Sequence, residues 1–288
     1  MQYSMLTSSV AHSANNTDPK LLNPFDVVWD GCALWVTARM SSEVIQYTPH
    51  GKRMSAVNVP MPTGICAGTE KGCKKRTQSV YVASAGGNVY MLGDVASSST
   101  MMPKIHVSPG GMLGGVAWHK HKLYVAVYDA GYVAVYNGTT MELTLKDDAL
   151  MAIGYKPYGV RCIGKKIYIT YTNLSMRQGA GYVNVYAAGC KGGLHRVISR
   201  ANLSMPYGVF ASDGDDSSIS VANAGTGYIS TFSSEYCYMY NERNTYEGDI
   251  VLDGIMGTAQ VDRKTYFVTS SDGGRVGALG VLRRAGHK

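Results

Sequence analysis

The sequence of 288 residues contains little charge and little phenylalanine. Charged residues make up 16% of it, and its 4 Phe stand against 21 Tyr and 34 Gly. Glycine supplies the positive φ angles of tight turns, and tyrosine suits a half-buried pleated surface. The composition therefore favours many short strands joined by tight turns.

Segments that would export the chain or anchor it in a membrane are also missing from the sequence. Residues 1–17 carry no basic stretch followed by an apolar run, so we expect no signal peptide. No apolar stretch approaches the length that crosses a bilayer, so we expect no membrane span. These absences predict a cytoplasmic protein.

The sequence patterns of several enzyme classes are absent as well. No Gly-x-Ser-x-Gly elbow occurs, so a serine hydrolase of that type has no support. None of the 6 cysteines has the C-x-x-C spacing of a zinc ribbon or a thioredoxin-type pair. We expect the cysteines to be reduced, and in an exported protein Cys66 and Cys73 would be the first disulfide to test.

The formal net charge of +7 favours acidic partners. Many of the basic residues form two local groups, which we interpret as a solvated loop and a chain end. No nucleic-acid motif or platform of stacking aromatic residues accompanies them, so nucleic acid is not an expected partner. The first group is Lys71, Lys74, Lys75 and Arg76, and the second is Arg283, Arg284 and Lys288.

An internal repeat runs through the sequence. Each of its six copies opens with a turn containing Pro or Gly that leads into a short apolar strand, and the copies follow one another at intervals of 38 to 51 residues. A period in this range is typical of a four-stranded propeller blade. The opening segments are residues 24–27, 62–65, 113–116, 157–160, 206–209 and 255–258.

Further strands follow each opening segment. The second strand is rich in β-branched and aromatic residues, as in residues 167–170, and the third alternates, as in residues 132–136. Outer fourth strands are weaker, and the candidates are residues 54–59, 104–107 and 194–199. No stretch indicates a long amphipathic helix.

The last copy has no outer strand of its own. We expect residues 3–10 to supply it by pairing beside residues 276–282, which would close the ring and tie the two ends together. The sequence thus predicts an all-β fold, a six-bladed β-propeller of four-stranded blades. We expect residues 1–288 to form a single domain, with blades starting near residues 23, 61, 112, 156, 205 and 254 and with residues 1–22 as closing strand and lead-in.

The repeat also resembles a known protein family. Residues 6–9 and 17–24, followed by the segments Pro62-Thr63-Gly64-Ile65 and Pro206-Tyr207-Gly208-Val209, are similar to an uncharacterised bacterial family of six-bladed propellers related to NHL-repeat proteins. The chain departs from that family at Phe25-Asp26, where the family has Trp-Gly. The resemblance implies the fold without an established activity, and an association of such propellers with large DNA viruses makes a virion location an expectation beside the cytoplasm.

Polar residues are expected to gather at the propeller axis, where loops enter the first strand or leave the second. We interpret this ring as a polar channel filled by water and hydrogen bonds, because Asn and Asp are also what turns prefer. No catalytic residue is assigned, and no metal site is expected; Asp129, Asn173 and Asn223 are weak candidates for metal ligands. The candidate binding residues are Asp26, Arg39, Asp129, Tyr158, Asn173, Tyr207, Asn223 and Ser271.

Two other motifs are interpreted as polar turns. His119-Lys120-His121 offers two imidazoles without a third ligand nearby, so we expect a solvated turn and not a metal site. Asp213-Gly214-Asp215-Asp216 resembles half of a calcium loop but lacks the remaining oxygen ligands.

Two functions are compatible with these patterns. The first is a non-catalytic interaction or structural propeller with a protein partner, in a larger assembly such as a virus particle, where the positive charge would meet an acidic surface. The alternative is a metal-dependent hydrolase or lactonase with its site in the central channel, for which calcium or zinc would be the cofactor. The absence of a convergent catalytic set favours the first.

Overall fold

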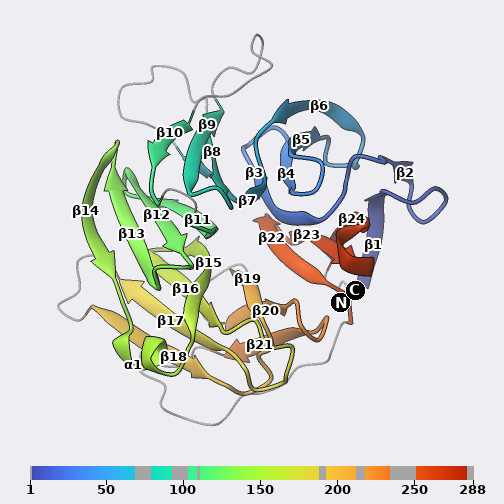
Figure 1. Ribbon diagram of the computed structural model, residues 1–288. Helices are drawn as coiled ribbons and strands as arrows, with labels where there is room; N and C mark the ends of the chain where they lie inside the picture. The colour runs from blue at the N-terminus through green and yellow to red at the C-terminus, as the bar shows by residue number, and fades with distance from the viewer. Residues whose placement is uncertain are drawn as a thin grey trace.

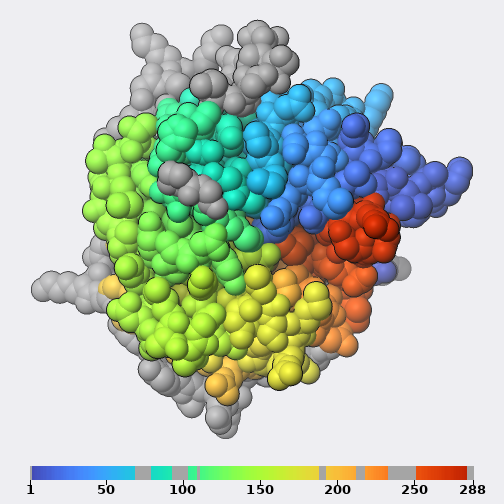
Figure 2. Space-filling model, in the orientation of Figure 1, coloured from blue at the N-terminus to red at the C-terminus, as the bar shows by residue number. Residues whose placement is uncertain are grey.

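The computed structural model describes residues 2–68, 79–92, 103–108, 111–187, 193–211, 218–233 and 251–283. Its strands form six sheets, antiparallel except for the pair β1 and β2, that follow one another around a central axis in chain order (Figure 1). The colours of Figure 2 follow the same circular order. The predicted fold is confirmed: the protein is a six-bladed β-propeller. The basic residues 71–76, the residues 213–216, Arg284 and Lys288 lie outside the described residues.

Each blade places its first strand at the axis and its later strands progressively outward. The first blade contains β3 (Pro24–Trp29), β4 (Leu34–Ala38), β5 (Glu43–Tyr47) and β6 (Arg53–Asn58). The second contains β7 (Pro62–Gly68), β8 (Ser79–Ser84), β9 (Asn88–Leu92) and β10 (Pro103–His106). The third contains β11 (Leu113–His119), β12 (Lys122–Val127), β13 (Tyr132–Asn137) and β14 (Thr140–Leu145).

The remaining three blades repeat this order. The fourth contains β15 (Lys156–Ile163), β16 (Lys166–Thr172), β17 (Tyr182–Ala187) and β18 (Leu194–Ser199). The described residues of the fifth form β19 (Pro206–Ala211), β20 (Ser218–Asn223) and β21 (Ile229–Ser233). The sixth contains β22 (Ile255–Val261), β23 (Lys264–Ser271) and β24 (Val276–Arg283).

The N-terminal strand completes the sixth blade, as predicted. Strand β1 (Gln2–Ser8) pairs antiparallel with β24, from Gln2 opposite Arg283 to Ser8 opposite Ala278, and the short β2 (Asn16–Thr17) pairs with β1. The two ends of the chain therefore lie side by side in Figure 1. This pairing couples the two termini, because the sixth blade lacks its outer strand without β1.

Helix contributes little to the fold. The five-residue helix α1 (Asp148–Ala152) connects the third and fourth blades, and the carboxylate of Asp147 caps it by accepting a hydrogen bond from the Leu150 N–H. A 3-10 turn, η1 (Asp272–Gly274), joins β23 to β24. No described helix is long and apolar enough to span a membrane.

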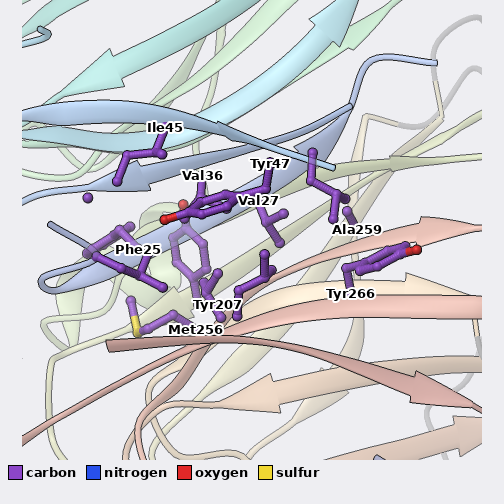
Figure 3. Close-up of a cluster of buried hydrophobic side chains, with 14 of the residues drawn as sticks. Phe25, Val27, Val36, Ile45, Tyr47, Tyr207, Met256, Ala259 and Tyr266 are labelled. Carbon is purple, nitrogen blue, oxygen red and sulfur yellow. The ribbon is translucent and has the colours of Figure 1, made fainter. Parts of the chain in front are cut away.

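The hydrophobic core is divided among the junctions between blades. The buried side chains of the described residues form six clusters, and each cluster joins two neighbouring blades. The cluster between the sixth and first blades also reaches the axis, where Phe25, Tyr207 and Met256 meet (Figure 3). Each blade thus buries its two faces against neighbours, which is why a repeat of this kind is stable only in a closed ring.

Candidate binding site at the propeller axis

A single position of the repeat decides how closely the blades approach one another. The third residue of the opening segment is glycine in five blades, at Gly64, Gly115, Gly159, Gly208 and Gly257. A Cβ atom on any of the five would collide with atoms of the following blade, which are backbone atoms in most cases. The inner strands therefore pack backbone against backbone, and this leaves no open channel at that level.

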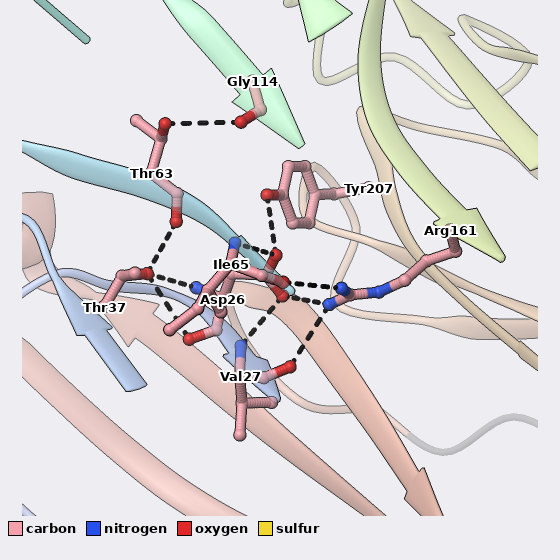
Figure 4. Close-up of polar contacts among 8 residues, drawn as sticks. All are labelled: Asp26, Val27, Thr37, Thr63, Ile65, Gly114, Arg161 and Tyr207. Atoms are coloured by element: carbon pink, nitrogen blue, oxygen red, sulfur yellow. Dashed lines mark hydrogen bonds and ion pairs between the residues drawn. The ribbon is translucent and has the colours of Figure 1, made fainter. Parts of the chain in front are cut away.

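Asp26 occupies the same position in the first blade, and it is buried, with 1% of its surface exposed. Its carboxylate accepts hydrogen bonds from the N–H of Val27 at 2.8 Å and of Ile65 at 3.1 Å, and from the hydroxyl of Tyr207 at 3.1 Å. It also forms an ion pair with the guanidinium of Arg161 (Figure 4). One carboxylate thus connects the first, second, fourth and fifth blades.

Arg161 reaches the axis from strand β15 of the fourth blade. Besides Asp26, its guanidinium donates to the carbonyl oxygens of Ile65 at 3.0 Å and Val27 at 3.3 Å. Inner strands are edge strands, so their backbone groups on the axial side have no ladder partner. Asp26 and Arg161 together supply hydrogen-bond partners for these edge groups of the first two blades.

The electrostatics of this pair follow from its burial. Burial raises the pKa of Asp26, and the Arg161 guanidinium, the two backbone N–H groups and Tyr207 oppose that rise. Burial and the neighbouring Asp26 also raise the pKa of Tyr207 well above its usual value, so Tyr207 stays a hydrogen-bond donor. The Asp26 carboxylate therefore has four partners within the protein, and three of them lie in other blades.

Two threonines extend these contacts around the ring. The Thr37 hydroxyl accepts from the Asp26 N–H at 2.9 Å and donates to the Thr63 carbonyl at 2.7 Å. The Thr63 hydroxyl in turn donates to the Leu113 carbonyl at 2.8 Å and to the Gly114 carbonyl at 3.3 Å, and Figure 4 draws the contact with Gly114. A chain of hydrogen bonds therefore links the inner strands of the first three blades.

Aromatic side chains fill the end of the axis where the inner strands begin. Phe25, Tyr158 and Tyr207 pack edge to face, with ring centroids 4.9–5.8 Å apart, and Tyr128 packs on Tyr158. The Arg39 guanidinium lies 5.9 Å from the centroid of the Phe25 ring. This end is an aromatic plug, in contrast to the water-filled polar channel that the sequence suggested.

The other sequence-predicted residues surround this plug without converging on one point. The Asp129 carboxylate is exposed and accepts from the Met112 N–H at 2.6 Å, and Asn173 is exposed and caps its own turn by accepting from the Ser175 N–H at 3.0 Å. Asn223 is fully buried, and its amide bonds the Ser204 N–H, the carbonyls of Val221 and Tyr228, and the Ser230 hydroxyl. Ser271 is half-buried at the start of η1.

Metal-binding groups are not clustered in the described part of the chain. No three His, Cys, Asp or Glu side chains there lie close enough to hold a metal ion. The amide of Asn223, one of the weak candidates for a metal ligand, is already engaged by structural hydrogen bonds on both its oxygen and its nitrogen.

A cavity of about 500 Å³ lies at the opposite end of the axis, where the inner strands finish. Its lining comes from the inner strands of all six blades. The walls are mainly small or apolar, and the side chains of Trp29 and Trp118 contribute aromatic surface. The small and apolar members are Val27, Ala67, Val116, Ala117, Val209, Ala211 and Ala259. Both the size and the lining are typical of a ligand site.

Polar groups also line the cavity, Asp262 among them, and one of the lining residues has a hydroxyl without a partner. The hydroxyl of Thr258 is buried and makes no hydrogen bond within the protein. Arg161 and Gln260 also line the cavity, and the Gln260 side-chain oxygen accepts from the Ala211 N–H at 3.2 Å. Because an unpaired buried hydroxyl is costly, Thr258 is a polar group that the fold leaves unsatisfied.

A cysteine and a histidine meet at the cavity wall. Cys162 Sγ lies 3.2 Å from His119 Nδ1, and the other ring nitrogen of His119 is buried without a partner. Burial and Lys120 lower the pKa of His119, and burial raises the pKa of Cys162, so both are neutral near pH 7. The expectation of a solvated turn therefore fails at His119, which is buried at the end of β11, whereas Lys120 and His121 form the turn with positive φ.

Three of the cysteines lie in the described part of the chain. Cys32, Cys66 and Cys162 are free thiols, and burial raises the pKa of Cys66 strongly. Cys73 lies outside the described residues, so the pair Cys66 and Cys73 stays untested.

The sequence analysis found Asp26 and Tyr207 but missed Arg161 and the cavity. The sequence does mark Arg161 as unusual, because it is the one charged residue in the otherwise apolar segment 158–163. Asp26 carried the matching signal, because it replaces the glycine found in the other five copies. An acid and a base that break the same repeat in different blades indicate an ion pair across the axis.

Comparison with known sequences finds relatives in a giant virus. No family model matches the chain. Uncharacterized protein R648 of Acanthamoeba polyphaga mimivirus is 23% identical over 290 residues, which cover 88% of this chain and 72% of the relative. Uncharacterized protein R640 of the same virus is 23% identical over 236 residues, covering 74% of this chain and 44% of the relative.

Solved structures with the same architecture include enzymes and a WD40 domain. Virginiamycin B lyase from Staphylococcus aureus, in a catalytically inactive form with quinupristin, has a TM-score of 0.59 at 11% identity, over 91% of this chain and 80% of its own. The PQQ-bound aldose sugar dehydrogenase of Streptomyces coelicolor reaches 0.62 at 12% identity, over 97% of each chain. The WD40 propeller domain of Doa1 reaches 0.57 at 9% identity, also over 97% of each chain. At these identities the likeness establishes the fold alone.

Proposed function

We propose that the protein is a non-catalytic interaction propeller that binds a protein partner at the axial cavity. One observation carries the proposal: the ionisable groups at the axis are engaged with one another and with strand edges, and a concave cavity lined by all six blades lies beyond them. Asp26 and Arg161 have partners in several blades, and Tyr207 is held as a donor to Asp26. Binding needs a preformed concave surface of this kind.

The proposal extends to the setting in which the protein works. We propose that it belongs to a larger assembly such as a virus particle and that it shares ancestry with NHL-related propellers. The similarity to two mimivirus proteins supports the viral setting. Mass spectrometry of purified particles from the natural source tests it, and a protein absent from particles at every stage of assembly contradicts it.

The binding function is tested by capture from the natural source with two matched variants. Ala67→Trp fills the cavity, and Met176→Trp adds the same ring at a residue that is 69% exposed at the plugged end of the axis. We expect wild type and Met176→Trp to capture the same partner and Ala67→Trp to lose it. Capture that Ala67→Trp retains in full would contradict the proposal.

The hydrolase alternative makes a separate prediction. A metal bound only by the folded state would raise thermal stability by mass action. We expect calcium and zinc to leave the melting temperature unchanged, and a metal-dependent rise together with lactone hydrolysis would replace the interaction proposal with the enzyme.

A further inference from the structure

The mouth of the axial cavity is surrounded by exposed basic residues. Each blade turns from its first to its second strand at this end, and three described turns place exposed cations here, at Lys120, Lys165 and Arg263. Lys264, also exposed, follows Arg263. We call these four residues the basic collar.

Acidic residues balance the collar only in part. Asp262 is exposed beside Arg263. Asp30 is half-buried, and its carboxylate is turned back onto its own blade, where it accepts from the N–H groups of Cys32 and Ala33 at 2.8 Å and from Trp35 Nε1 at 2.6 Å. The described turns around the mouth therefore carry a net positive charge, in the same sense as the whole chain.

The cavity itself favours an aromatic or long apolar group. Trp118 is one of the lining residues, and its ring is held in place by stacking on Tyr81 with ring centroids 5.0 Å apart. Small residues such as Ala67 also line the cavity. Aromatic rings bury large areas and favour contacts with other rings.

From these observations we infer that the partner inserts one aromatic side chain, flanked by acidic residues, into the axial cavity. This inference rests on the proposed function and specifies the chemistry of its ligand. The collar residues Lys165 and Arg263 lie on turns at the rim of the cavity, directly beside the lining residues Gly164 and Asp262. A peptide segment reaches both, because its anchor fills the cavity and its neighbours lie over the collar.

The partner would bind at the end of the axis where the inner strands finish. The sequence indicated the opposite end, where they begin. Loops that enter the first strand surround Phe25, Tyr158 and Tyr207, whose rings occupy the space a ligand would need. The finishing end of the same strands holds the cavity. An approaching partner therefore reaches this cavity from the collar side.

Selection of random peptides displayed on phage against the intact protein tests the inference. We expect the enriched peptides to carry Phe, Tyr or Trp next to Asp or Glu. Their affinity, measured by fluorescence anisotropy, is expected to fall ~30-fold or more in Ala67→Trp, as for the loss of a buried anchor. The double variant Lys120→Glu/Lys165→Glu is expected to weaken binding ~10-fold at low salt and much less at high salt, since exposed charges are screened.

The outcomes separate the two proposals. Met176→Trp is the matched control and is expected to bind like wild type. Enriched peptides that are neutral or basic but lose binding in Ala67→Trp would overturn the acidic partner and leave the cavity as the binding site. If the peptides bind Ala67→Trp as tightly as the wild type, or if no peptide is enriched, both the proposed function and the acidic partner are overturned. Folding of each variant is checked by its melting temperature, so loss of binding is not confused with loss of structure.

Discussion

The two ends of the propeller axis are built from the same six strands but carry different side chains. Where the strands begin, Phe25, Tyr158 and Tyr207 fill the axis, and Asp26 and Arg161 lie directly beneath them. Where the strands finish, small residues leave a cavity of about 500 Å³. The comparison teaches that large and charged residues on a propeller axis need not mark its binding site, because here they fasten the blades to one another.

Removal of Arg161 is the change expected to break the filled end most severely. In Arg161→Met, the Asp26 carboxylate would stay buried without its cation, and two carbonyl oxygens would lose a donor. We expect the free energy of unfolding to fall by about 3–5 kcal/mol, as for other buried ion pairs broken on one side. Urea denaturation measures it, and a loss below about 1 kcal/mol would show that the pair does not hold the blades together.

Truncation of the aromatic plug is expected to have the next largest effect. Phe25→Ala removes a buried ring that contacts Tyr158 and Tyr207. We expect a loss of about 3 kcal/mol, because the neighbouring rings cannot close the space. The control Met176→Ala alters an exposed side chain and is expected to change stability by less than about 0.5 kcal/mol. Equal effects from the two variants would contradict the account.

Adding one methyl group at the glycine of the opening segment tests how closely the inner strands pack at the filled end. Gly159→Ala would place a Cβ atom against the carbonyl of Tyr207 in the next blade. We expect a loss of about 1–3 kcal/mol from overpacking, measured by thermal unfolding. Gly86→Ala is the matched control, since the nearest atom to its Cβ would be Ser84 Oγ at 3.5 Å, and we expect little change there. If Gly159→Ala is as stable as the wild type, the blades do not pack backbone to backbone.

The smallest change in the free energy of unfolding is expected at the end of the axis that holds the cavity. There the substitution is expected to stabilise the protein. Thr258→Val removes a buried hydroxyl that has no hydrogen-bond partner. We expect stability to rise by about 1 kcal/mol, whereas Thr37→Val at the filled end loses about 1 kcal/mol because its hydroxyl bonds the Asp26 N–H and the Thr63 carbonyl. Calorimetry on both variants checks the pair. Equal losses in the two would mean that Thr258 is a structural residue like Thr37.

Much of the fold could be predicted from the sequence because its signals are local. Turns with Pro or Gly and alternating strands mark each blade, and they required no knowledge of distant contacts. The pairing of β1 with β24 followed from counting strands, since residues 276–282 lacked an outer neighbour. The prediction placed the closing strand at residues 3–10, and the structure has it at Gln2–Ser8.

The site was harder to predict because it depends on contacts between blades. The partners of Asp26 in other blades are 39, 135 and 181 residues away, at Ile65, Arg161 and Tyr207. No local pattern reports such pairs. The cavity has no motif either, because it is defined by small residues such as Ala67 and Ala117 at the ends of strands. The sequence indicated which residues face the axis but not which end of it is open.

The most direct test of the account is a double-mutant cycle on Asp26 and Arg161. The variants Asp26→Gly, Arg161→Met and their combination are unfolded in urea beside the wild type. We predict that the combination, which restores glycine to the repeat and leaves no unpaired charge, loses at least about 1 kcal/mol less than the sum of the two single losses, so that the losses are strongly non-additive. Losses that add to within about 0.5 kcal/mol would contradict the claim that this pair fastens the blades at the axis.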